Sequence, residues 1–228
     1  MLKLDGITKT HRDGAGSVDV LRSVSLSIEA REFVVVMGPS GSGKTTLVNI
    51  ASGIELPTFG EVQFGATNIG RANARERARL RRRVIGVVFQ DHELDPVLSA
   101  AENVALPMQL DGMRGDATSE HVGRALARSN VSDIAHRRPH EMSGGQRQRV
   151  AIARAIAGPD KQFLVVDEPT ASLDSVAARM IVELFVDLRT QGLGVLMTTH
   201  DSRLASYGDR IVVLRDGALV ENSGVGWQ

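Results

Sequence analysis

The sequence contains no cysteine among its 228 residues, which excludes disulfide bonds and thiolate metal sites. It also lacks an excess of charge of either sign, because 27 lysine and arginine residues balance 27 aspartate and glutamate residues. A formal net charge of zero gives no bulk attraction to a polyanion. We therefore expect no nucleic-acid partner.

Long hydrophobic runs are missing as well. The longest are about five residues, whereas a helix that spans a bilayer needs roughly 18 apolar residues. The first residues, Met1–Asp5, do not resemble the apolar region of a signal peptide. We expect a soluble, cytoplasmic chain that reaches a membrane only through a partner. Its hydrophobic fraction of 42% is enough for one core or for a core with a small subdomain.

The most informative stretch runs from Phe33 to Thr46. Its first five residues are apolar and predict a short buried strand, and the following turn reads Gly38-Pro39-Ser40-Gly41-Ser42-Gly43-Lys44-Thr45. This is the phosphate-binding pattern G-x-x-x-x-G-K-[ST], in which Lys44 meets the β- and γ-phosphates and Thr45 meets Mg²⁺. Glycines let backbone N–H groups surround an anion, and the next helix adds the positive end of its dipole. The alternative is a glycine-rich turn with a chance lysine, which the flanking apolar segments disfavour.

The remaining pattern predicts an α/β fold. Alternating apolar residues at 2–4 and 18–28 predict an antiparallel patch, with a glycine-rich loop at 13–16 between them. Further strands are expected at 61–64, 84–89, 163–166, 193–197, 211–214 and 218–220. Helices are expected at 44–51, 71–83, 100–109, 120–129, 146–157 and 177–190. The stretch 91–158 is the simplest to explain as a helical insertion between strands of the core.

The predicted helix at 71–83 carries seven arginines. A helix of this kind can contact acidic lipid headgroups or RNA. Since the chain as a whole has no net charge, we favour a solvated helix face.

Polar residues directly follow several predicted strands: Gln90, Asp167, Glu168 and His200. In an open parallel sheet these strand ends share one edge, where ligands bind. Asp167 suits Mg²⁺ together with Thr45, and Glu168 suits a general base for an attacking water. The alternative for Glu168 is a surface acid before a proline turn. His200 is placed to contact a γ-phosphate.

A second anion cradle is predicted at Ser143-Gly144-Gly145-Gln146, directly before a helix. Its hydroxyl, its exposed backbone N–H groups and the helix N-terminus all favour an anion. The alternative is a plain N-capped helix after a flexible turn. A chain with one nucleotide site has no obvious need for two cradles.

Taken in order, these motifs resemble the ATP-binding subunit of ATP-binding-cassette (ABC) transporters over essentially the whole chain. The matching stretches are the Walker A Gly38–Thr45, the Q-loop Gln90, the signature Ser143–Gln146, the Walker B Phe163–Asp167, the catalytic Glu168, the D-loop Ser172–Asp174 and the switch His200. The resemblance implies a RecA-like P-loop NTPase core with an antiparallel β subdomain and an inserted helical subdomain. It implies a single ABC ATPase domain at 1–228, with 1–90 and 159–228 as core and β subdomain and 91–158 as helical subdomain.

The resemblance also implies an ATPase that uses ATP and Mg²⁺. Catalytic roles fall on Glu168, His200, Gln90 and Lys44, and the metal would be held by Thr45, Gln90 and Asp167. The implied nucleotide contacts are His11, Gly38, Pro39, Ser40, Gly41, Ser42, Gly43, Lys44, Thr45, Thr46, Gln90, Ser143, Gly144, Gly145, Gln146 and Asp174.

Two kinds of partner follow from the resemblance. One is a second copy in a head-to-tail dimer, with each ATP between the Walker A of one chain and Ser143–Gly145 of the other. The other is an integral-membrane permease that would hold the chain at the cytoplasmic face of the inner or plasma membrane. Residues 91–110 would form part of the groove for the permease's coupling helix.

Stretches such as Ile85–Gln90 and Glu102–Pro107 look most like the group of lipoprotein-release, macrolide-efflux, haem-export and cell-division ATPases. Extrusion of a hydrophobic or amphipathic substrate such as haem, a drug or a peptide is the expected function. The alternative is an ATPase that regulates envelope or cell-division enzymes. Action on DNA or ribosomes is less favoured, because neither a long coiled coil nor a second cassette fits in the chain.

The chain departs from the family pattern at Met142, which replaces a leucine, in the order of the small residues 170–172, and at His11, which stands where an aromatic residue usually stacks on adenine. Histidine offers less stacking area than tyrosine, so we expect weaker or less selective recognition of the base. The substitution His11→Tyr should tighten ATP binding in an equilibrium titration. Unchanged affinity would count against a base contact at this position.

Overall fold

The computed structural model describes residues 1–13 and 16–220, so Gly14 and Ala15 of the predicted loop lie outside the described residues. A six-stranded sheet with the order β10-β9-β3-β8-β7-β6 forms its centre. Its strands are β3 (Phe33–Met37), β6 (Ile85–Val88), β7 (Phe163–Val166), β8 (Gly194–Thr199), β9 (Arg210–Arg215) and β10 (Ala218–Val220). Neighbouring strands run parallel, except that β10 pairs antiparallel with β9.

The helices are α1 (Lys44–Ala51), α2 (Ala74–Arg83), α3 (Ala100–Leu110), α4 (Asp116–Arg128), α5 (Gly144–Ile156), α6 (Ser175–Thr190) and α7 (Ser202–Ala205). Two short 3₁₀ helices, Ser132–Ile134 and Pro139–Glu141, lie between α4 and α5. Within the described ranges, none of these helices has the length and apolar character needed to cross a bilayer. α4 and α6 begin at Asp116 and Ser175, a few residues before the predicted starts at 120 and 177, because their first residues are mostly exposed and lie outside the apolar pattern.

The central sheet is buried on both faces. Val34 and Val36 of β3 face a core shared with α1, whereas Phe33 and Val35 face a second core shared with α5 and α6. In the second core the ring of Phe33 meets that of Phe185 edge-on, with centroids 6.3 Å apart. A strand covered on both faces needs apolar residues at every position, which explains its continuous apolar sequence.

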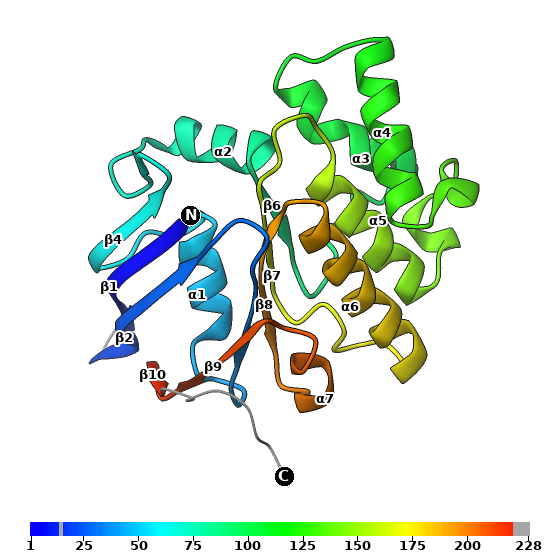
Figure 1. Cartoon of the computed structure of the whole chain (residues 1–228). Helices are drawn as coiled ribbons and strands as arrows, with labels where there is room; N and C mark the ends of the chain where they lie inside the picture. The colour runs from blue at the N-terminus through cyan, green and yellow to red at the C-terminus, as the bar shows by residue number, and fades with distance from the viewer. Residues whose placement is uncertain (14–15, 221–228) are drawn as a thin grey trace.

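A second, antiparallel sheet with the order β2-β1-β4-β5 lies beside α1 (Figure 1). It consists of β1 (Leu2–Asp13), β2 (Gly16–Ile28), β4 (Phe59–Phe64) and β5 (Thr67–Asn68). The predicted antiparallel patch is confirmed, but β1 continues well past Leu4 and stays paired with β2 up to Asp13. Its last buried apolar residue is Ile7, so the apolar pattern stops before the backbone pairing does.

The helices α3, α4 and α5 pack against one another on the opposite side of the central sheet from β1 and β2 (Figure 1). In the sequence these helices lie between β6 and β7, as expected of the predicted helical insertion. α3 begins with a capping box in which Ser99 and Glu102 bond each other's backbone N–H groups. The chain enters these helices from β6, which is the edge strand of the central sheet.

The arginines of α2 are not simply solvated. Arg77 and Arg81 both donate to the carbonyl of Gly53, and Arg82 and Arg83 both contact the carboxylate of Asp111. The prediction of a solvated face is therefore wrong for these four side chains, because carbonyl and carboxylate groups from other segments come within their reach. Arg75 and Arg79 are exposed as predicted.

Lys161 lies just before β7 and ties α2 to the central sheet. Its Nζ donates to the carbonyl of Arg81, 2.8 Å away, in the last turn of α2. Burial lowers the pKa of Lys161 to about 7. The folded chain thus holds this amine in surroundings that disfavour its charge.

This burial makes stability depend on pH. In the unfolded chain the amine stays protonated up to about pH 10, whereas the folded chain loses the proton near pH 7. The unfolded state therefore binds more protons above pH 7, and folding gains stability as pH rises. We expect the unfolding free energy of the wild type, relative to Lys161→Met, to increase from pH 7 to pH 9 in urea titrations.

Between pH 5 and about pH 6 the amine is protonated in both states, so the difference between the two proteins should be constant there. A difference that stays constant up to pH 9 would contradict the lowered pKa.

Candidate functional site

The turn between β3 and α1 folds back over the side chain of Lys44. The Nζ atom of this buried lysine donates to the carbonyls of Gly38, at 2.8 Å, and Pro39, at 3.0 Å. A Cβ at Gly38 would lie 2.3 Å from the carbonyl oxygen of Leu214 in β9. At Gly43, which has a φ of 102°, it would lie 2.7 Å from the carbonyl oxygen of Val20 in β2. Strands of both sheets thus approach this turn closely and leave no room for a side chain at these two positions.

The start of α1 has the features of an anion site. Its N-cap residue Gly43 has no side chain, so the first N–H groups of the helix receive no side-chain cap. The Oγ atom of Ser42 is buried and has no hydrogen-bond partner within the described ranges. Thr45 is exposed in the first turn of the helix. These unpaired donors fit phosphate oxygens, which the positive end of the helix dipole also attracts.

Glu168 joins two other predicted site residues. Its Oε1 lies 3.0 Å from Nζ of Lys44, and its Oε2 lies 2.5 Å from Nδ1 of His200. The three residues follow β3, β7 and β8, which are adjacent in the sheet. Glu168 has a φ of 42°, a left-handed conformation that costs a non-glycine residue about 1–2 kcal/mol. The ion pair with Lys44 and the hydrogen bond with His200 help to offset this strain.

Thr198, which no sequence motif marked as a site residue, organises the two carboxylates. Its fully buried hydroxyl donates to Oδ1 of Asp167, at 2.6 Å, and accepts from the backbone N–H of Glu168, at 3.0 Å. One hydroxyl on β8 therefore sets the positions of both acidic residues after β7. In the sequence Thr198 is only a threonine near the end of an apolar strand, and threonine is common in strands that have no catalytic role.

The predicted metal ligands are Thr45, Gln90 and Asp167. They would offer a hydroxyl, an amide carbonyl and a carboxylate, an all-oxygen set of the kind that Mg²⁺ prefers. Asp167 is buried at 3% exposure, whereas Thr45 and Gln90 are exposed. Gln90 follows β6, the neighbour of β7, and so lies at the same carboxyl edge as the other site residues. The donor chemistry therefore fits a magnesium ion that also binds phosphates.

The Ser143–Gln146 cradle is a complete capping box. The Oγ of Ser143 accepts from the N–H of Gln146 at 3.2 Å, and the Oε1 of Gln146 accepts from the N–H of Ser143 at 2.9 Å. Because the hydroxyl oxygen acts as an acceptor here, its proton can still be donated to a ligand. Within the described part of the chain, no hydrogen bond joins this cradle to residues 38–46. The cradle caps a helix, and it also retains donors for an anion.

Two further predicted nucleotide contacts have partners within the chain. Oδ1 of Asp174 accepts from the N–H groups of Val176 and Ala177, so this residue is the N-cap of α6. Nε2 of His11 lies 3.3 Å from Oε1 of Glu55, and the imidazole is half exposed. Their contacts with a nucleotide stay predictions.

Comparison with known proteins decides the family. The family model described as ABC transporter matches residues 21–171. The chain belongs to the ABC transporter family. It is 40% identical over 220 residues to the lipoprotein-releasing system ATP-binding protein LolD 1 of Rhodospirillum rubrum. The matched stretch covers 96% of this chain and 97% of that protein.

A second relative is the macrolide export ATP-binding/permease protein MacB of Chlorobaculum tepidum. It is 39% identical over 225 residues, which are 97% of this chain and 34% of that longer protein. Among solved structures, the dimeric post-hydrolysis state of the ATP-binding cassette MJ0796 bound to ADP and Pi superposes with a TM-score of 0.89. It is 38% identical, and the match covers 97% of each chain. The predicted fold class and ATPase activity are thereby confirmed.

The Thr198 hydroxyl provides a test of this arrangement. Thr198→Val keeps the shape of the side chain but removes the hydroxyl partner of Asp167 Oδ1 and of the Glu168 N–H. This loss should cost about 1–3 kcal/mol of stability. Urea unfolding of the purified chain measures this loss. Thr199→Val is the matched control, because its hydroxyl accepts a single bond, from the N–H of Asp201. A loss no larger than that of the control would contradict the organising role of Thr198.

Proposed function

We propose that this chain binds and hydrolyses ATP to drive a separate membrane permease that extrudes a hydrophobic or amphipathic substrate. The observation that carries the catalytic part is Glu168, which contacts both Lys44 and His200 at the carboxyl edge of the sheet. The proposed organisation is a single domain, with 1–90 and 159–228 as core and β subdomain and 91–158 as helical subdomain.

Residues 38–46 would hold the phosphates through their backbone N–H groups and Lys44. A γ-phosphate competes with Glu168 for the same ammonium, which Glu168 now contacts at 3.0 Å. Once Lys44 turns to the phosphate, Glu168 is able to accept a proton from the attacking water. His200, 2.5 Å from Glu168, is then placed to hold the carboxylate or to contact the γ-phosphate. Mg²⁺, held by Thr45, Gln90 and Asp167, would neutralise the phosphate charge.

The second cradle gains a purpose if two copies pair head to tail. Ser143–Gly145 of one copy would then cover the phosphates bound to residues 38–46 of the other. The dimeric MJ0796 structure supports this arrangement. So does the cradle itself, because the Ser143 proton and the first N–H groups of α5 have no other partner in the capping box.

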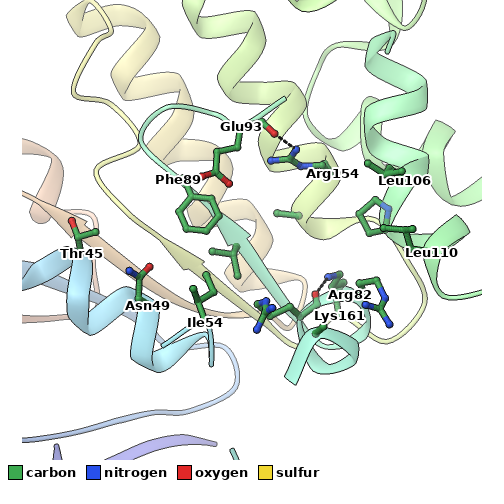
Figure 2. A pocket seen from close by; sticks show the side chains of 15 residues that line it. Thr45, Asn49, Ile54, Arg82, Phe89, Glu93, Leu106, Leu110, Arg154 and Lys161 are labelled. Carbon is green, nitrogen blue, oxygen red and sulfur yellow. Dashed lines mark hydrogen bonds between the residues drawn. The ribbon is translucent and has the colours of Figure 1, made fainter. Parts of the chain in front are cut away.

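A cavity of about 800 Å³ is the proposed docking place for the permease (Figure 2). Apolar side chains from three segments line it: Ile54, Phe89, Leu106 and Leu110. Such a lining, between the helical group and the core, suits one face of a short helix. A coupling helix seated there would hold the chain at the cytoplasmic face of the membrane. The permease would determine the substrate, and the MacB relative, named for macrolide export, supports extrusion.

The substitution Glu168→Gln tests the proposed role of the carboxylate. It removes the general base but keeps nearly the same shape, so hydrolysis should fall by at least about 100-fold. Without hydrolysis, ATP with Mg²⁺ should convert the chain to a dimer, which light scattering after size exclusion detects. The exposed carboxylate of Glu183 on α6 provides a control, and Glu183→Gln should hydrolyse ATP normally and stay monomeric.

Normal hydrolysis by Glu168→Gln would show that another group is the base. The Glu168→Gln variant, carrying an affinity tag and isolated from membranes in the presence of ATP, should co-purify with an integral-membrane protein. Recovery of nucleic acid or ribosomes in its place would contradict the transport function.

A further inference from the structure

We propose that Arg154 is a positioning residue: it fixes the loop that carries Gln90 to the helix that carries the Ser143–Gln146 cradle. The proposal rests on the proposed function, because it assumes that Gln90 acts in hydrolysis. It goes further by identifying one side chain that links, within a single copy, the Gln90 loop of that copy's nucleotide site to the cradle that would cover the site of the other copy.

Arg154 lies in the last turn of α5 and reaches the loop that follows β6. Its Nη1 donates to the carbonyl of Glu93, at 2.5 Å, and its Nη2 donates to the carbonyl of His92, at 2.8 Å. Figure 2 shows this guanidinium pointing at Glu93. Hydrogen bonds from a charged donor are stronger than those between neutral groups. The planar guanidinium therefore holds two consecutive peptide groups at once.

The loop is bent at the same two residues. His92 has a φ of 64° and Glu93 a φ of 47°, a backbone conformation that residues with side chains rarely adopt. Two consecutive residues of this kind persist only where their surroundings hold them. Arg154 donates to the carbonyls of both strained residues, so its loss should release the bend of the loop that begins at Gln90.

The end of α5 also packs directly on the strand that leads to Gln90. A Cβ at Gly86 in β6 would lie 2.3 Å from the carbonyl oxygen of Ala155, the residue after Arg154. Strand and loop are thus both seated on one turn of α5. Since α5 is a continuous helix from its N-cap Ser143, a shift of the cradle moves Arg154 with it and carries the loop along.

Arg154 and Glu93 also line the cavity proposed for the permease helix. An occupant of that cavity would touch the link between cradle and loop. This placement gives the permease a physical route to the hydrolytic site.

The test compares Arg154→Met and Arg154→Lys in the full chain, with Mg²⁺ and ATP as the probe. Arg154→Met should lower kcat about 10-fold and change the KM for ATP less than about 2-fold, because residues 38–46 keep the phosphates. Arg154→Lys should recover part of the loss, since an ammonium still reaches a carbonyl but lacks the planar fork. In a Gln90→Ala background, Arg154→Met should cause little further loss.

A second readout follows the loop itself. The chain has no cysteine, so Asp91→Cys gives a single site for a spin label on an exposed loop position. We expect Arg154→Met to increase the mobility of this label without ATP, and Arg154→Lys to increase it less. Arg77→Met is the matched control, because Arg77 also holds two backbone carbonyls but on α2. It should lower the melting temperature without changing kcat or label mobility.

Unchanged mobility and unchanged kcat in Arg154→Met would overturn the proposal. A second outcome is increased label mobility in Arg154→Met together with normal kcat in both Arg154→Met and Gln90→Ala. This outcome would overturn the catalytic role of Gln90 and therefore the positioning role of Arg154 in hydrolysis, although the contact between Arg154 and the loop would be supported. Equal kcat losses in Arg154→Met and Arg77→Met would show a general effect of stability and would also overturn it.

Discussion

The carboxylate of Glu168 is the contact on which the rest of the site depends. It joins the ammonium of Lys44 to the imidazole of His200, and each of the three residues follows a different strand of the central sheet. The contact exists only because parallel strands bring their carboxyl ends to one edge. The two buried cores, which cover both faces of the sheet, keep that edge in register.

Much of this arrangement could be predicted from the sequence, because it depends on local patterns. The strand–turn–helix around Lys44 needs glycines at set places, and the strands of the core need unbroken apolar runs. Ser143 and Gln146 stand three positions apart, which is the spacing of a capping box. Relationships within a few residues are thus visible in the chain itself.

What could not be predicted depends on contacts between distant segments. Thr198 serves Asp167 and Glu168 from another strand, and Arg154 holds carbonyls 61 and 62 positions away. Backbone carbonyls have no sequence signature, so their arginine partners look like ordinary surface charges. The length of β1 was missed for a related reason, since backbone pairing continues where the apolar pattern has ended.

The crowding around the phosphate turn has a consequence for related chains. The carbonyl of Val20 approaches both Gly43 and Gly217, and the carbonyl of Leu214 approaches Gly38. Gly43 and Gly217 are therefore required for the two sheets to meet, and Gly38 for β9 to lie against the phosphate turn, whether or not a nucleotide is ever bound. A descendant that lost its catalytic residues would still retain them in order to fold. The presence of these glycines therefore indicates the fold. Whether such a chain still hydrolyses ATP is better judged from the charged residues of the site.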